Sequence, residues 1–174
     1  MNTEQQKIEY KSLQKIRTGE KGFKELSTTC VALANAQGGQ IMIGVEDKTK
    51  KPAPNQVIPQ EEANSAVTRL RGLCFNVGLA VGDVCEDETG SQYFAITVFP
   101  SLHSYATTSD GKMYIRVADK CEPVRSEDIQ RVGEEKGAFQ WELVPTQFEL
   151  EDENKTNLSK FANDIRQSDR VKQH

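Results

Sequence analysis

The 174-residue sequence contains no hydrophobic run long enough to cross a membrane, since a spanning helix needs about 20 mostly apolar residues. Its first residues, Met1–Gln6, also lack the basic start and the apolar stretch of a secretory signal peptide. We therefore expect no membrane partner and a cytoplasmic location.

Cysteine is scarce, and its spacing does not suit zinc. Cys30, Cys74, Cys85 and Cys121 form no CxxC pair, and the chain has only two histidines. Structural zinc sites combine four such ligands at short spacings, so we expect no zinc. Cys30 and Cys74 fall in apolar helical patterns and are predicted to be buried. All four thiols are expected to be reduced in the cytoplasm.

The chain also lacks the overall positive charge of a generic nucleic-acid binder. It has 22 Lys+Arg against 26 Asp+Glu, a net charge of −4. The charge is unevenly distributed, however. Residues 1–51 hold nine basic and six acidic residues, whereas residues 122–153 hold three and ten. The basic N-terminal part is compatible with a polyanionic ligand.

The clearest local pattern is a helix followed by a buried strand. Apolar residues recur at helical spacing from Phe23 to Ala36. Gly38-Gly39 should end this helix, because glycine takes left-handed dihedral angles without steric cost. No Gly-Lys-Ser/Thr follows, so the glycine pair is not a P-loop. The short apolar run Gln40–Val45 then predicts a central strand.

The remaining periodicities predict an α+β fold with a mixed β-sheet packed against helices. The other predicted elements, in chain order, are a strand at 7–13, a loop at Lys48–Pro59, a helix at Gln60–Leu73, a hairpin of Ala80–Cys85 with Tyr93–Phe99, a polar loop at Ser101–Lys112, a strand at Met113–Val117 and a short helix from Ser126.

The composition changes after Gly137. We assign residues 1–136 to one domain and residues 137–174 to an acidic linker plus a C-terminal helix at 154–171. That helical pattern is followed by no stop signal before His174, so we expect it to lead into downstream domains of a longer protein.

Three carboxylates are candidates for a shared site. Glu9 and Lys11 alternate along the first predicted strand and should share one face, with Glu4 five residues before Glu9. Asp47 follows the central strand, at the carboxyl end of the sheet, where ligands often gather. Carboxylates suit Mg²⁺ or Mn²⁺, which can polarise a phosphate and activate water, while Lys11 stabilises developing charge. In the alternative interpretation, Glu9 and Lys11 are the solvent face of an edge strand and Asp47 opens a turn.

The loop after the central strand carries three lysines, Lys48, Lys50 and Lys51. Lysines in such a position can contact phosphates and position a nucleic acid. A solvated loop is the alternative interpretation.

Several of these segments together resemble the Schlafen-type Alba-like domain, which is also called divergent AAA although it lacks the AAA phosphate loop. The resemblance rests on Glu4 followed by Ile8-Glu9-Tyr10-Lys11, on Phe23-Lys24-Glu25, on Ala34-Asn35-Ala36-Gln37-Gly38-Gly39, on Ile43-Gly44-Val45-Glu46-Asp47, and on Met113–Val117 followed by Ser126–Ile129. It covers about residues 4–132.

The resemblance implies a Schlafen/Alba-like fold and binding to RNA or DNA. In Schlafen ribonucleases, three acids of this pattern form the metal-dependent active site for transfer and ribosomal RNA, and they fall here on Glu4, Glu9 and Asp47. In bacterial relatives, the same domain is described as a DNA- or nucleotide-binding module of predicted transcriptional regulators. Schlafen nucleases pair two such lobes, so a nuclease built from this chain would have to be a homodimer. The alternative is a non-catalytic regulatory or oligomerisation domain whose acids are structural.

Overall fold

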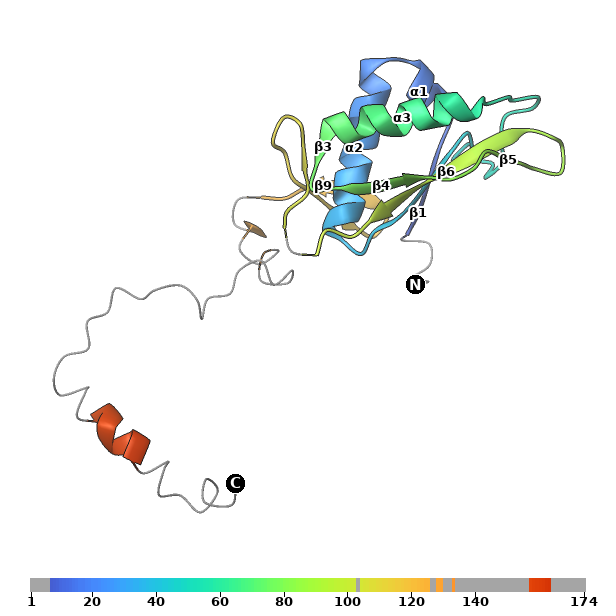
Figure 1. Cartoon of the computed structure of the whole chain (residues 1–174). Helices are drawn as coiled ribbons and strands as arrows, with labels where there is room; N and C mark the ends of the chain where they lie inside the picture. The colour runs from blue at the N-terminus through green and yellow to red at the C-terminus, as the bar shows by residue number, and fades with distance from the viewer. Residues whose placement is uncertain (1–6, 103, 126–127, 130–132, 134–156, 164–174) are drawn as a thin grey trace. The chain divides into compact units, whose positions relative to one another are not determined.

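The computed structural model describes residues 7–102, 104–125, 128, 129, 133 and 157–163 (Figure 1). The chain divides into two compact units, Met1–Phe139 and Gln140–His174. The described part of the second unit, residues 157–163, is helical and lies within the predicted helix at 154–171. Among the described residues, no helix is both long and apolar enough to span a membrane.

A mixed β-sheet forms the centre of the first unit. Its strand order is β1-β2-β6-β4, and β5 also pairs with β6. β1 and β2 are parallel, whereas β6 is antiparallel to β2, β4 and β5. The strand bounds are β1 Ile8–Lys11, β2 Gly39–Ile43, β4 Gly78–Val81, β5 Cys85–Glu86 and β6 Gln92–Phe99. Together with the helices, this sheet confirms the predicted α+β class.

The hydrophobic core lies between one face of this sheet and the two long helices, α2 (Glu20–Asn35) and α3 (Gln60–Leu73). The short helix α1 (Gln14–Arg17) precedes α2. Ile41 and Ile43, which alternate along β2, are fully buried, whereas Gln40, the residue before Ile41, is exposed. Burial of one such side chain contributes about 1.5–3 kcal/mol to the free energy of unfolding. A shift of one residue would expose these side chains, so the buried face fixes the register of the strands.

Gly38 lies in the turn between α2 and β2. Its N–H donates to Leu33 O at 2.9 Å, which satisfies a carbonyl at the end of the helix. Its φ of +74° lies in the left-handed region that favours glycine. A Cβ at this position would also lie 2.6 Å from Val98 O. The predicted glycine stop is therefore confirmed, with steric crowding as a second reason for glycine.

The main sequence predictions agree with the structure. The predicted helix Phe23–Ala36 is α2, and the predicted strand Gln40–Val45 is β2, which lies between β1 and β6. The helix Gln60–Leu73 has the predicted bounds. Cys30 and Cys74 are buried as expected, and hydrogen bonding to Cys74 together with burial raises the pKa of Cys30.

Two strand pairings were missed. The polar loop predicted at Ser101–Lys112 contains β7 (Thr107–Thr108), which pairs with β3 (Cys74–Phe75). The predicted strand at Met113–Val117 is β8 (Tyr114–Val117), and it forms a hairpin with β9 (Lys120–Pro123). β3 and β7 are too short to show a period of two, and β9 is polar and ends in proline. The predicted helix from Ser126 begins outside the described residues.

Asn35, the last residue of α2, joins this helix to two distant segments. Its Nδ2 donates to Ala106 O at 2.8 Å and to Tyr114 O at 2.9 Å, and its Oδ1 accepts from Ala106 N at 2.9 Å. The residue is only 5% exposed. Buried polar groups are costly unless they are paired, and Asn35 pairs three of them at once. It therefore holds β8 against the end of α2.

We predict that Asn35→Ala lowers the free energy of unfolding by about 3 kcal/mol, because it leaves the backbone groups of Ala106 and Tyr114 without their partner. Urea denaturation measures the change. Asn64→Ala is the matched control, since Asn64 is exposed on α3 and should change stability by less than about 0.5 kcal/mol. Equal effects of the two substitutions would contradict the role given to Asn35.

Candidate functional site

Glu9 and Lys11 share one face of β1, as their alternation predicted. In the parallel register, Glu9 lies beside Ile41 and Lys11 beside Ile43, so both point to the face that the helices cover. β1 is the terminal strand of the sheet order, and the two side chains remain 18% and 25% exposed. They are therefore neither core residues nor the solvent face that the alternative interpretation described.

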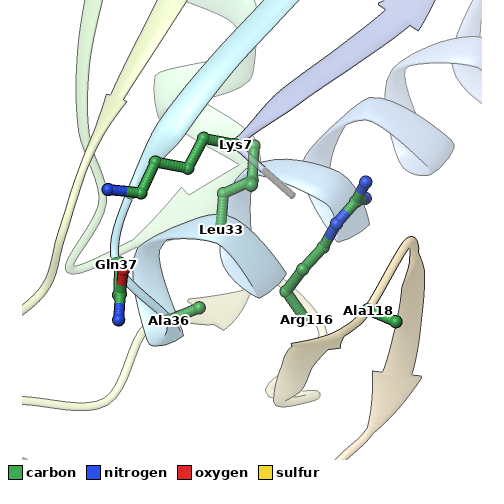
Figure 2. Close-up of a pocket in the computed structure, with 7 residues that line it drawn as sticks. Lys7, Leu33, Ala36, Gln37, Arg116 and Ala118 are labelled. Carbon is green, nitrogen blue, oxygen red and sulfur yellow. The ribbon is translucent and has the colours of Figure 1, made fainter. Parts of the chain in front are cut away.

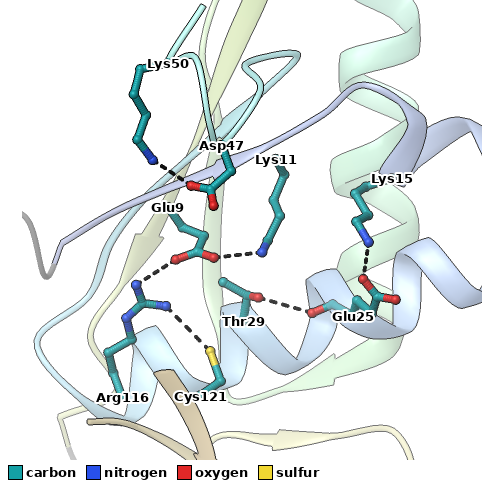
Figure 3. A network of polar contacts seen from close by, with 9 residues as sticks. All are labelled: Glu9, Lys11, Lys15, Glu25, Thr29, Asp47, Lys50, Arg116 and Cys121. Atoms are coloured by element: carbon teal, nitrogen blue, oxygen red, sulfur yellow. Dashed lines mark hydrogen bonds and ion pairs between the residues drawn. The ribbon is translucent and has the colours of Figure 1, made fainter. Parts of the chain in front are cut away.

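The Glu9 carboxylate accepts from two cations (Figure 3). Lys11 Nζ lies 2.7 Å from Oε1, and Arg116 Nη2 lies 2.6 Å from Oε2. The Arg116 side chain, which comes from β8, is only 5% exposed. Burial alone would lower the pKa of Arg116, but the hydrogen bond and the charge of Glu9 raise the pKa above its usual value. Arg116 Nη1 also donates to Cys121 Sγ on β9 at 3.6 Å.

Asp47 lies beyond the end of β2 and pairs with Lys50 at 2.6 Å. The hydrogen bond from Lys50 and the charge of Lys50 lower the pKa of Asp47, and the charge of Lys11 lowers it further. In Figure 3, the Asp47 side chain points toward Glu9 and Lys11. The structure thus brings Asp47 to the edge of the sheet that Glu9 and Lys11 occupy. We call the set Glu9, Lys11, Asp47, Lys50 and Arg116 the charged edge.

The predicted lysine loop contributes to the opposite face of β1. Lys50 Nζ lies 4.2 Å from the centroid of the Tyr10 ring, a cation–π contact. Lys50 and Lys51 line a hollow of about 650 Å³ together with Tyr10 and Tyr93, and Glu86–Glu88 also line it. This hollow therefore joins basic and aromatic side chains with an acidic turn. Lys48 is exposed in the same loop.

The three-acid metal site stays a prediction. Glu4 lies outside the described residues, and among those that are described no three His, Cys, Asp or Glu side chains are grouped to hold a metal ion. Both Glu9 oxygens already accept from cations, and Asp47 pairs with Lys50. As described, the residues of this edge do not fit a divalent ion, so no catalytic step is derived through one.

Arg116 is the residue of this site that the sequence did not reveal. Met113–Val117 was predicted as a strand, and a single arginine within it gave no sign of its partner 107 positions earlier. The acid–lysine alternation on β1 indicated the position of Glu9 and Lys11 but not this second cation.

Comparison with known proteins decides the family. The sequence model described as Schlafen, AlbA_2 matches residues 4–125. The chain belongs to the Schlafen AlbA_2 family. Membership in this family indicates that the domain is related to nucleic acids. A comparison with curated proteins gives no match.

A crystal structure of the DIP2311 protein from Corynebacterium diphtheriae has a similar fold, with a TM-score of 0.51 and 21% sequence identity. The match covers 71% of this chain and 26% of that chain, so this chain spans about a quarter of the length of the solved protein.

We predict that Glu9→Ala lowers the free energy of unfolding by about 3 kcal/mol, because it leaves the buried Arg116 guanidinium without its acceptor. The control is Glu25→Ala. Glu25 pairs with Lys15 at an exposed position, so its loss should cost less than about 1 kcal/mol. Urea denaturation of both variants at neutral pH measures the difference. A Glu9→Ala protein as stable as the control would show that the Glu9–Arg116 pair does not hold β8 against β1.

Proposed function

We propose that this domain binds RNA or DNA along the charged edge, as a module of a longer regulatory protein. One observation carries the proposal. Around the edge strand β1, Lys11 and Arg116 pair with Glu9 on one face and Lys50 pairs with Asp47 beside Tyr10 on the other, which gives a local surplus of one positive charge on a chain with a net charge of −4. A local basic site of this kind attracts phosphates even when the whole protein is acidic.

The acids have a positioning role in this proposal. Lysine and arginine side chains lose rotamer freedom when they bind a phosphate, and a carboxylate that already holds them reduces that loss. Glu9 holds Lys11 and Arg116, and Asp47 holds Lys50. The cations are thus fixed before the ligand arrives, and the two acids keep them from repelling one another.

The hollow beside the charged edge extends the proposed interface. Bases of a single strand stack on aromatic side chains, and lysines follow the backbone phosphates. Tyr10 and Tyr93 supply the aromatic surface, and Lys50 and Lys51 supply the charge. The acidic turn Glu86–Glu88 borders the same hollow, which limits the path of a strand to the lysine side.

We predict that replacing Lys48, Lys50 and Lys51 with Glu weakens binding to a single-stranded RNA by at least about tenfold, because the loop then repels phosphates. Wild-type affinity should fall steeply between about 50 and about 200 mM salt, through loss of counterion release. Fluorescence anisotropy measures both effects on RNA and on duplex DNA.

The matched control replaces Lys21, Lys24 and Lys112 with Glu, which changes the net charge equally at exposed positions outside the charged edge. It should retain most of the affinity. If wild-type protein binds neither RNA nor DNA at low salt, the domain is the non-catalytic regulatory or oligomerisation domain. Sedimentation of the same samples then tests for a homodimer.

Metal-dependent RNA cleavage by Glu4, Glu9 and Asp47 is the second candidate function. It is favoured by Lys11, which pairs with Glu9 and whose charge also lowers the pKa of Asp47, and opposed by the cations that both acids already hold. Lys11 would stabilise the negative charge that develops on the phosphate.

If this candidate is correct, Mn²⁺ or Mg²⁺ supports cleavage of transfer RNA, and Asp47→Ala lowers the rate by at least about a hundredfold through loss of a ligand. Asp110→Ala is the control, because Asp110 also pairs with a lysine but lies outside the charged edge. A gel assay of RNA length follows the reaction. Intact RNA after hours with wild-type protein and Mn²⁺ would exclude catalysis.

A further inference from the structure

Two hollows near strand β1 differ in how their charged side chains lie. The smaller, of about 160 Å³, lies beside Arg116, but in Figure 2 the Lys7 side chain points away from the Arg116 guanidinium. The larger, of about 650 Å³, is lined by Tyr10, Tyr93, Lys50, Lys51 and Glu86–Glu88. We call the larger one the tyrosine hollow. Its volume lies in the range of about 300–1,000 Å³ that is usual for small-molecule sites, so it suits one nucleotide.

The floor of the tyrosine hollow is the face of the sheet opposite α2 and α3. Tyr10 on β1 lies beside Met42 on β2, and Tyr93 on β6 points to this face because it precedes Phe94, which points into the core. The Tyr10 ring is covered by Lys50. Tyr93 is half-buried and has no cation over its ring within the described part of the chain. It is therefore the tyrosine on which a base can stack.

One wall of the tyrosine hollow is positively charged. It is formed by the loop after β2, where Lys50 is held by Asp47, whereas Lys51 makes no ion pair within the described part of the chain. The backbone of Lys51 is fixed, because its carbonyl accepts from Glu46 N at 3.0 Å. A lysine without a carboxylate partner keeps its charge for a phosphate. The phosphate of a bound nucleotide should therefore lie on this side.

The other wall is the turn between β5 and β6, and its three acids are not equivalent. Asp87 shapes the turn, because its Oδ1 accepts from the N–H and the hydroxyl of Thr89 at 2.8 and 2.6 Å. Glu86 Oε1 accepts from Gln92 Nε2 at 2.9 Å. Glu88 is exposed, and its carboxylate has no hydrogen bond or ion pair among the residues that the structure describes. Glu88 is therefore the acid that can accept from a ligand.

The two walls lie close enough to contact one ligand. The hydrogen bond from Thr89 is the main cause of the lowered pKa of Asp87, and the charge of Lys51 lowers this pKa further. Lys51 must then lie within electrostatic reach of the acidic turn, because salt screens exposed charges beyond about 10 Å. A single nucleotide spans such a gap, with its phosphate at Lys51 and its base at the turn.

An acidic wall selects among bases by their hydrogen-bonding edges. A carboxylate only accepts hydrogen bonds, and its two oxygens suit two donors that lie side by side. Among the common bases, guanine presents such a pair, N1–H and N2–H₂, on its Watson–Crick edge. Adenine and cytosine place a ring-nitrogen acceptor beside their amino group, and uracil places a carbonyl on each side of its N–H. Those acceptors would face a carboxylate oxygen without a proton between them.

We propose that the tyrosine hollow binds one guanine of a single strand. The base stacks on Tyr93, Glu88 accepts from N1–H and N2–H₂, and Lys51 contacts the phosphate. This site rests on the proposed function and specifies the base that the proposed interface prefers. The acidic turn, which repels a phosphate backbone, then acts at the edge of the base.

Strands that differ in one base test this preference with the full chain. Oligo-uridine carries one central guanosine, inosine, adenosine or uridine, and fluorescence anisotropy measures the affinity of each strand. The guanosine strand should bind at least about fivefold more tightly than the other three, because a site built for two donors keeps an unpaired acceptor when one is missing. Inosine is the sharpest comparison, since it lacks only the N2 amino group of guanosine.

Glu88→Gln separates recognition of the base from general attraction. This variant should reduce the guanosine preference to within about twofold, whereas its affinity for plain oligo-uridine should stay equal or rise, because a negative charge near phosphates is removed. Glu61→Gln makes the same charge change at an exposed position on α3, on the other face of the sheet, and should retain the preference. Equal binding of all four strands by wild type, or a guanosine preference that survives Glu88→Gln, overturns the inference.

Guanosine and uridine monophosphates separate this inference from the proposed function, with the ring resonances of Tyr93 as the readout. Strand binding without any base preference overturns the inference and retains the proposed function. Saturable shifts with the guanosine monophosphate alone, lost in Glu88→Gln, without binding of any strand retain the guanine site and overturn the proposed function. No binding of strands or monophosphates overturns both.

Discussion

The three hydrogen bonds of Asn35 are the interaction on which the candidate site depends. One of them fixes the backbone of β8 at Tyr114 to the end of α2, and the other two hold Ala106. Arg116 lies two residues beyond Tyr114 on the same strand. Because alternate residues of a strand share a face, the position of Tyr114 sets the direction in which Arg116 extends. Without this link, the β8–β9 hairpin would contact the rest of the domain through fewer polar groups, and Arg116 would not be held at Glu9.

Glu9 completes this arrangement from the other side. It is on the edge strand of the sheet and accepts from one cation of its own strand and one of β8. Breaking such a half-buried pair leaves a charge without a partner, so the pair specifies where the hairpin lies more than it adds stability. Asn35 and Glu9 therefore hold the same hairpin. Asn35 binds the backbone of β8 at Tyr114, and Glu9 binds the side chain of Arg116.

The sequence predicted those parts of the fold that local rules control. Helical spacing and glycine placed α2, and the short apolar run placed β2, because burial of one face selects the period of each element. The hairpin strand β9 was missed, since its residues have no apolar alternation and its pairing depends on tertiary contacts. For the site, alternation placed Glu9 and Lys11 on one face of β1. Arg116 was not predictable, because no local rule relates positions that far apart.

The position of Glu9 makes two functions compete for one carboxylate. As a partner of Arg116, it holds β8 against the sheet. As a metal ligand, it would have to give up Lys11 or Arg116, because each of its oxygens already accepts from one of them. Releasing Lys11 costs less than releasing Arg116, since Lys11 is 25% exposed and can turn to water, whereas Arg116 is 5% exposed and cannot. Any cation that reaches Glu9 should therefore displace Lys11 and leave the hairpin in place, and the released Lys11 would then be free to meet a phosphate.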